Sequence, residues 1–160
     1  MEIKGEKVVL RPVDPADYPR LRELLARPEV HVWWGDLDDD ELAKLLVILY
    51  QGEIAGGIQY EEETDPDYPH AGIDVFLDPT IRGQGLGVDA VRTLARWLID
   101  ERGHHRLTID PAVTNTAAIR AYEKVGFKPV GVMRKYERNP VTREWNDNLL
   151  MDLLAEELAP

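Results

Sequence analysis

The sequence contains no cysteine. Disulfide bridges, thiolate metal ligands and a cysteine nucleophile are therefore excluded. The four histidines are scattered, and together with the carboxylates they do not form the spacing of a metal site. We therefore expect no bound metal.

Long apolar runs are missing as well. No stretch approaches the roughly 20 apolar residues that a membrane-spanning helix needs. The first residues, MEIKGEKVVLRP, are charged and do not resemble an export signal. The sequence therefore predicts a cytoplasmic protein without a membrane partner.

Basic residues are scarce compared with acidic ones. The sequence has nineteen lysines and arginines but thirty aspartates and glutamates, which gives a formal net charge of -11. Nucleic acid is excluded as a partner, because its phosphates require a basic face. The acidic excess either attracts a cationic partner or only keeps the protein soluble.

The 160 residues have the length of one compact domain, and no internal repeat divides them, so we predict a single domain over residues 1–160. Alternation of apolar and polar residues predicts an opening strand at 3–13. Strand-like runs bounded by turns and loops predict further strands at 46–63 (a hairpin turning at 51–53), 71–78, 105–111, 127–136 and 147–154. Helical periodicity and capping residues predict helices from Asp14 and Pro15 onward, at 41–45, from the glycine-rich segment to about Gly103, and at 114–126. We expect residues 31–41 to be irregular. This order of elements predicts an α/β domain with a mixed sheet flanked by helices.

Three glycines crowd the segment RGQGLG at 82–87, between a predicted strand and a predicted helix. A nucleoside triphosphate loop is excluded, because Val88 and Asp89 follow where lysine and serine or threonine are required. The dinucleotide fingerprint has a different glycine spacing. The remaining interpretation is a loop at the start of a helix whose backbone N–H groups point toward an anion.

A second motif, NTAAIRAYEKVGF, follows about thirty residues later. Its helical spacing places Ala118, Tyr122 and Val125 on one face. Taken alone, Tyr122 also fits a core tyrosine whose hydroxyl bonds to the backbone. The two motifs together resemble the GNAT superfamily of acetyl-coenzyme A-dependent N-acetyltransferases, and the resemblance extends over nearly the whole chain.

The resemblance implies a splayed mixed sheet with coenzyme A wedged between two parting parallel strands. In that arrangement the loop amides face the pyrophosphate, Arg82 supplies a positive charge, and Ala118 leaves room for the pantetheine arm. Cofactor contacts are expected at Val75, Leu77, Arg82, Gly83, Gln84, Gly85, Leu86, Gly87, Asn115, Ala118 and Tyr122.

Several stretches resemble aminoglycoside 6'-N-acetyltransferases: VWWG (32–35), EEETDP (61–66), GID (72–74) and IDP (109–111). This resemblance implies that Asp74 is the general base, that Asp110 binds the aminoglycoside, and that Tyr122 protonates the leaving thiolate. The polycationic acceptor is expected to contact Trp33, Trp34, Asp36, Glu63, Asp74, Asp110 and Asp147. The segment before EEETDP is short in this chain, so other carboxylates must replace a contact found in some members.

The chemistry independently requires a carboxylate, because an amine with a pKa of roughly 8 to 10 attacks a thioester only after losing its proton. Asp74 lies in an otherwise apolar strand, where an aspartate also fits a purely structural capping role.

Two alternative functions remain: acylation of a siderophore lysine or protein N-terminus, and a coenzyme A-binding sensor without turnover. We expect a monomer or a homodimer.

Overall fold

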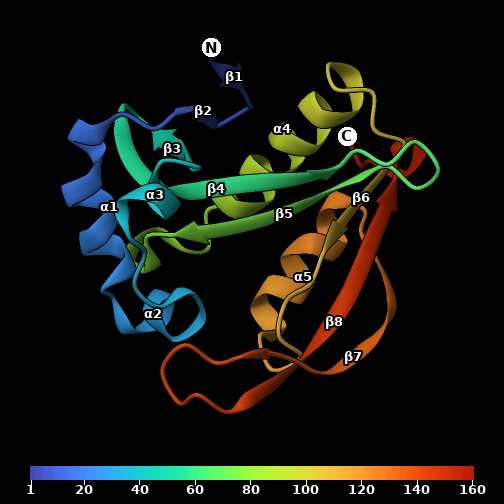
Figure 1. The fold of residues 1–160 in the computed structure, drawn as a ribbon. Helices are drawn as coiled ribbons and strands as arrows, with labels where there is room; N and C mark the ends of the chain where they lie inside the picture. Colours follow the sequence, from blue (N-terminus) through green and yellow to red (C-terminus); the bar gives the residue numbers. More distant parts are fainter.

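One open sheet of eight strands organises the molecule (Figure 1). The computed structural model describes all 160 residues. The strands are β1 (Ile3–Lys4), β2 (Val8–Pro12), β3 (Leu46–Tyr50), β4 (Glu53–Glu63), β5 (His70–Leu77), β6 (Arg106–Ile109), β7 (Lys128–Arg138) and β8 (Trp145–Leu154). Their spatial order is β1-β2-β3-β4-β5-β6-β8-β7. Only β5 and β6 pair in parallel, so the sheet is mixed, as predicted.

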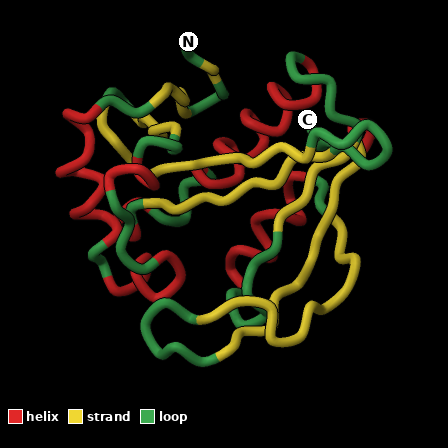
Figure 2. Tube along the Cα trace, viewed as in Figure 1, coloured by secondary structure: helices red, strands yellow, loops and turns green.

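Helices cover both faces of the sheet (Figure 2). They are α1 (Tyr18–Leu25), α2 (Pro28–Trp34), α3 (Asp39–Leu42), α4 (Leu86–Asp100) and α5 (Thr116–Val125). Side chains alternate between the two faces of a strand, and on β3 Val47 joins a small core with α1 to α3 while Ile48 joins the larger core with α4 and α5. On β5, Phe76 belongs to the small core and Ile73 to the large one. Asp74 therefore shares the sheet face that α2 covers.

The sheet splits between β5 and β6. These strands pair only at Ala71 with Leu107 and at Gly72 with Thr108. Figure 1 shows the two halves of the sheet meeting there and then diverging, with α5 beside the opening. The divergence leaves Asp74 and Asp110, which follow the last paired positions, on opposite sides of a gap.

Two sequence expectations were wrong at the N-terminal side. The predicted strand over 3–13 is a hairpin, because the chain turns between Lys4 and Val8 and pairs Ile3 with Leu10. The stretch 31–41 is not irregular throughout, since α2 runs to Trp34. Asp14 does cap the next element, but that element is a 3₁₀ turn that precedes α1.

Both expected ends of the helix after residue 114 are confirmed. Asn115 caps α5, and its side chain accepts a hydrogen bond from the Ala118 amide. Gly126 ends that helix. None of the helices combines the length and the apolar character needed to traverse a bilayer. No group of three or more histidines, aspartates or glutamates is arranged to hold a metal ion.

Candidate active site

The larger cavity, about 650 Å³, opens where β5 and β6 part, and we call it the acceptor cavity. Its lining contains no lysine or arginine. Six carboxylates line it: Glu61, Glu62, Glu63, Asp74, Asp110 and Glu137. Walls of one charge sign focus the electric field inside a cleft. The cavity is therefore built to attract cations.

Asp74 lies on β5, directly across from Gln59 on β4. Its side chain is open to solvent inside the cavity, although protein atoms crowd around it closely enough to desolvate the carboxylate in part. This desolvation raises its pKa, and the negative charges of Glu137 and Glu61 raise it further, although the Gln59 side chain partly offsets them. Asp74 therefore holds a proton more readily than an ordinary aspartate does.

Asp110 follows the end of β6 and faces Asp74 across the gap. Burial, Asp74 and Glu137 together raise its pKa to about 6, against hydrogen bonds from Asn148 and Tyr136. Two carboxylates that repel one another are stabilised by an ammonium group between them.

A bulge in β7 brings Tyr136 and Glu137 into the cavity wall. Between Met133 and Glu137 the strand takes four residue steps, where β8 takes two from Asn148 to Asn146. Lys135 adopts a positive φ of 49° at this point. Its amide donates a 2.8 Å hydrogen bond to the carboxylate of Asp147, which holds the bulge in place.

Tyr122 is contributed by α5 and lines the acceptor cavity. Its side chain is buried, and this burial raises the pKa of its hydroxyl, with further contributions from Asp74 and Asp110. The hydroxyl is therefore protonated at neutral pH, as a proton donor must be.

A second cavity of about 370 Å³ lies over the loop before α4, and we call it the cofactor cavity. Gly83 and Gly85 have positive φ values of 87° and 76°, a region that glycine enters without strain. None of the backbone N–H groups of residues 82–88 donates a hydrogen bond within the protein. A run of free donors at a helix N-terminus is suited to bind an anion.

The rest of the cofactor cavity suits a long, thin molecule with phosphates at one end. Arg82 and Lys124 supply positive charges. The apolar wall consists of Leu77, Ile81, Val88, Ala117, Ala118 and Ala121. A Cβ at Gly87 would come within 3.0 Å of Leu77, so glycine keeps the passage open. The residues present fit acetyl-coenzyme A.

The two cavities meet. Trp33, Trp34, Val75, Asn115 and Tyr122 line both of them. Trp34 is held edge-on against a core aromatic ring, with 4.9 Å between the centroids of Trp34 and Phe76. Molecules bound in the two cavities can therefore touch at the ring of Tyr122.

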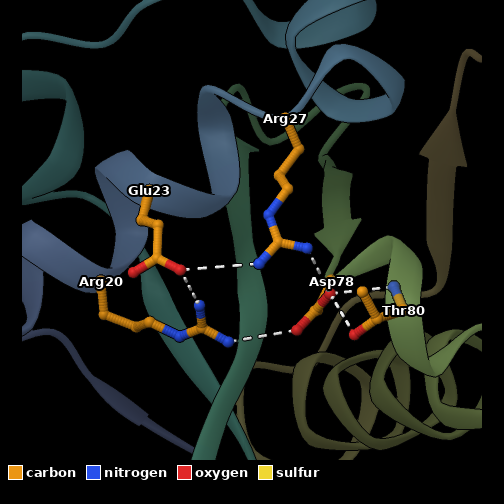
Figure 3. Close-up of polar contacts among 5 residues, drawn as sticks. All are labelled: Arg20, Glu23, Arg27, Asp78 and Thr80. Carbon is orange, nitrogen blue, oxygen red and sulfur yellow. Dashed lines mark hydrogen bonds and ion pairs between the residues drawn. The ribbon is translucent and has the colours of Figure 1, made fainter.

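Asp78 connects α1 and the start of α2 to the loop of the cofactor cavity (Figure 3). Its carboxylate accepts hydrogen bonds from the amide and hydroxyl of Thr80, at 2.9 and 2.8 Å. Arg20 and Arg27 approach the same carboxylate at 3.1 and 3.5 Å. Burial alone would raise the pKa of Asp78, but these partners outweigh it and hold the pKa below its usual value.

Among the carboxylates of the acceptor cavity, Glu62 pairs with an arginine and contacts a histidine. Arg102 donates to it at 2.9 Å, and Nε2 of His104 lies 2.6 Å from its other oxygen. The hydrogen bond from Arg102 is the main reason why its pKa is lowered, although burial opposes this effect. Part of the negative charge of Glu62 is therefore neutralised from outside the cavity.

The structure brings most of the expected site residues together. The cofactor cavity is lined by Val75, Leu77, Arg82, Gly83, Gly85, Leu86, Gly87, Asn115, Ala118 and Tyr122. The acceptor cavity is lined by Trp33, Trp34, Glu63, Asp74 and Asp110.

Three expected residues do not line either cavity. Asp36 is exposed and lies 3.3 Å from His31. Asp147 instead supports the β7 bulge. The side chain of Gln84 accepts a hydrogen bond from the hydroxyl of Tyr50, away from the cofactor cavity.

Some lining residues escaped the sequence reasoning. Gln59 was detectable, because it alternates with Glu61 and Glu63 on one strand face. Ala121 and Lys124 were detectable by helical spacing from Ala117 and Ala118. The sequence did not identify Glu137 as a lining residue, because a bulge shifts the alternation of side chains along the strand from which its orientation would be predicted.

Comparison with known proteins agrees with this geometry. The model of the acetyltransferase (GNAT) family matches residues 10–127. The aminoglycoside N(6')-acetyltransferase type 1 of Klebsiella pneumoniae is 31% identical over 158 residues, covering 81% of this chain and 78% of that protein. The L-amino acid N-acetyltransferase AaaT of Escherichia coli (strain K12) is 25% identical, covering 81% of this chain and 88% of that protein.

Solved structures share the fold. A GNAT-family acetyltransferase from Bacillus anthracis superimposes with a TM-score of 0.84 at 22% identity, covering 98% of this chain and 100% of that one. The structure of AAC(6')-Ib in complex with paromomycin and acetyl-CoA gives a TM-score of 0.75 at 27% identity, covering 95% of this chain and 96% of that one. The extent of the family match, together with the splayed sheet and the loop, shows that the chain belongs to the GNAT family of acetyltransferases, which take their acetyl group from acetyl-CoA.

Proposed function

We propose that this protein transfers the acetyl group of acetyl-CoA to the 6'-amine of an aminoglycoside. The observation that carries the proposal is the acceptor cavity, whose wall has six carboxylates and no lysine or arginine. A polycationic sugar matches such a wall in charge. The 31% identity to an aminoglycoside N(6')-acetyltransferase supports the same substrate class.

In the proposed reaction Asp74 is the general base. Acetyl-CoA supplies the acetyl group as a thioester. Asp74 binds the ammonium group of the acceptor and takes its proton, directly or through water, and the raised pKa of its carboxyl brings it closer to that of the amine. Only the neutral amine is a nucleophile.

Tyr122 is the proposed proton donor. It lines both cavities, where the acceptor and the acetyl group meet. Its hydroxyl proton passes to the sulfur of the departing thiolate. Asp110, Glu63, Trp33 and Trp34 are the proposed contacts for the rest of the acceptor, because each lines the acceptor cavity.

Free amino acids are the competing acceptors, since an L-amino acid N-acetyltransferase is also similar to this chain. Each carries a carboxylate beside its amine. The acceptor cavity has no lysine or arginine to neutralise that carboxylate and would repel it. The charge of the cavity therefore favours the aminoglycoside.

Thiol release from acetyl-CoA, measured with a panel of amines, tests the proposal. The panel contains an aminoglycoside with a 6'-amine, its 6'-hydroxyl counterpart, a free amino acid and a peptide. We expect turnover with the first compound only, and NMR of its product should place the acetyl group on the 6'-nitrogen. Rapid acetylation of the 6'-hydroxyl compound at another amine would refute the regiochemistry. Turnover of the amino acid or the peptide in preference to the aminoglycoside would refute the substrate class.

A further inference from the structure

A lysine from the start of the chain reaches the glycine loop. Lys7 lies in the turn between β1 and β2, and its ammonium group donates a 2.7 Å hydrogen bond to the carbonyl oxygen of Gln84. The contact joins residues 77 positions apart. Lys7 is not among the residues that line the cofactor cavity.

This contact determines which way a neighbouring amide points. In a trans peptide the C=O and the following N–H point in opposite directions, and no peptide bond in the structure is cis. With the Gln84 carbonyl turned toward Lys7, the Gly85 N–H is turned away from it. Gly85 itself has φ 76° and ψ 14°. Its N–H is one of the free donors of the loop.

The turn that carries Lys7 is itself fixed to α4. The buried carboxylate of Asp89, in the first turn of that helix, accepts hydrogen bonds from the amides of Glu6, Lys7 and Val8 at 3.2, 2.8 and 3.0 Å. Only glycine fits at position 5, because a Cβ there would lie 2.3 Å from the Thr93 hydroxyl oxygen. The helix thus places Lys7, and Lys7 in turn holds the loop that begins the helix.

We propose that Lys7 is a positioning residue for cofactor binding: it locks the Gln84–Gly85 peptide so that the Gly85 N–H faces the phosphates of acetyl-CoA. Tyr50 restrains the same loop residue by donating to the Gln84 side chain at 3.2 Å. Without Lys7 this peptide is free to rotate, and the anion site loses a preorganised donor. The proposal holds for any acetyl acceptor, so it stands apart from the choice of aminoglycoside.

The test variant is Lys7→Met, which removes the hydrogen-bond donor. Lys7→Arg keeps a donor at this position. Lys4→Met is the charge control, because it removes a positive charge from a side chain that makes no hydrogen bond to the loop. Steady-state kinetics use acetyl-CoA and also S-acetylpantetheine, a thioester without the phosphates. For Lys7→Met we expect the KM of acetyl-CoA to rise about tenfold, the effect of losing a hydrogen bond to a charged group. The kcat, the acceptor KM and the kcat/KM of S-acetylpantetheine should stay within twofold, and Lys7→Arg should recover most of the loss.

Calorimetric titration with coenzyme A gives the same comparison without turnover, with melting temperatures as a check on folding. An unchanged acetyl-CoA KM in Lys7→Met would overturn the proposal. An equal loss in Lys4→Met would also overturn it, because the cause would then be general charge. A matching loss with S-acetylpantetheine would overturn it too, since the damage would not concern the phosphates.

Discussion

Glu137 and Asn148 are joined across the β7–β8 hairpin by a hydrogen bond of 2.8 Å, from Nδ2 of the asparagine to Oε1 of the glutamate. Asn148 is fully buried, and the same Nδ2 donates to the backbone oxygen of Asp110 at 2.7 Å. One buried amide therefore places two parts of the acceptor cavity, the carboxylate of Glu137 and the segment that carries Asp110.

The first prediction concerns the charge of Glu137. Glu137→Gln keeps an oxygen for Asn148 but removes the negative charge, so a cation in the cavity loses one counter-ion. The acceptor KM should rise about fivefold to tenfold because a counter-ion of the bound cation is lost, and kcat should fall less, through the lower pKa that Asp74 has without the Glu137 charge. Glu144→Gln, in the same hairpin but outside the cavity lining, is the control and should leave the KM unchanged. An unchanged KM in Glu137→Gln would remove this residue from acceptor binding.

The proposed acid and base should differ in how much they matter. In Asp74→Asn a nearly isosteric side chain cannot take a proton, so kcat should fall about a hundredfold or more. Tyr122→Phe should cost less, because water can protonate a thiolate. Stopped assays of thiol release from pH 6 to 9 measure both variants, and the dissociation constant of coenzyme A checks that the cofactor site is intact. Full activity of Asp74→Asn across this range would exclude Asp74 as the base.

Asp110 makes stability depend on pH. Its pKa in the folded protein is about 6, above the usual 3.8, so ionisation at higher pH opposes folding. Asp110→Asn should therefore raise the free energy of unfolding by about 1 to 3 kcal/mol at pH 8. The gain should vanish at about pH 3 and below, under the usual pKa of 3.8, because the wild-type carboxyl is then protonated in both the folded and the unfolded protein. Urea unfolding at the two pH values tests this, and an equal gain at both would point to packing instead of charge.

Much of the fold could be predicted from the sequence, because local signals and final structure agree. The hairpin at 46–63 is indicated by two strand-like runs on either side of a turn at 51–53, and Asn115 and Gly126 bound α5 where capping rules place them. The opening hairpin could not be predicted. It depends on Asp89, some eighty residues away, which accepts the amides of the turn.

Some residues of the candidate site could likewise be predicted from the sequence, and others could not. The loop at 82–87, Asp74 and Tyr122 lie in contiguous motifs, so their places in the lining of the two cavities could be predicted from the sequence. Glu137 and Lys7 could not be found, since one depends on a bulge and the other on a contact between distant turns. Asp147 has the residue type of a substrate contact, yet its carboxylate is used by the Lys135 amide.

The Asp78 cluster in Figure 3 should contribute strongly to stability. Removing a buried carboxylate that faces two guanidinium groups and caps a turn is expected to cost about 2 to 4 kcal/mol, so Asp78→Ala should be markedly less stable. Asp78→Asn should lose less, because its side-chain oxygen can still accept from Thr80. Glu23→Gln is the matched control: it alters the exposed partner of Arg20 and Arg27 but leaves both pairs with Asp78, and should cost at most about 1 kcal/mol. Chemical denaturation measures the free energy of unfolding of the three variants. Equal losses in Asp78→Ala and Glu23→Gln would show that Asp78 does not stabilise the protein more than the exposed ion pairs do.

Salt should affect the two substrates differently. The acceptor cavity has carboxylates and no lysine or arginine in its lining, so it should capture a polycation partly by long-range attraction. Such attraction is screened over a Debye length of about 10 Å at 0.1 M salt. The aminoglycoside KM should therefore rise as ionic strength increases from 0.02 to 0.5 M, roughly the range over which this length shrinks several-fold. Acetyl-CoA is itself anionic and approaches a protein with a net charge of -11, so its KM should change little or fall.

Initial rates at several salt concentrations, varying one substrate at a time, separate the two effects. A parallel rise of both KM values would mean that salt inhibits the enzyme generally, and that the acidic wall does not steer the acceptor.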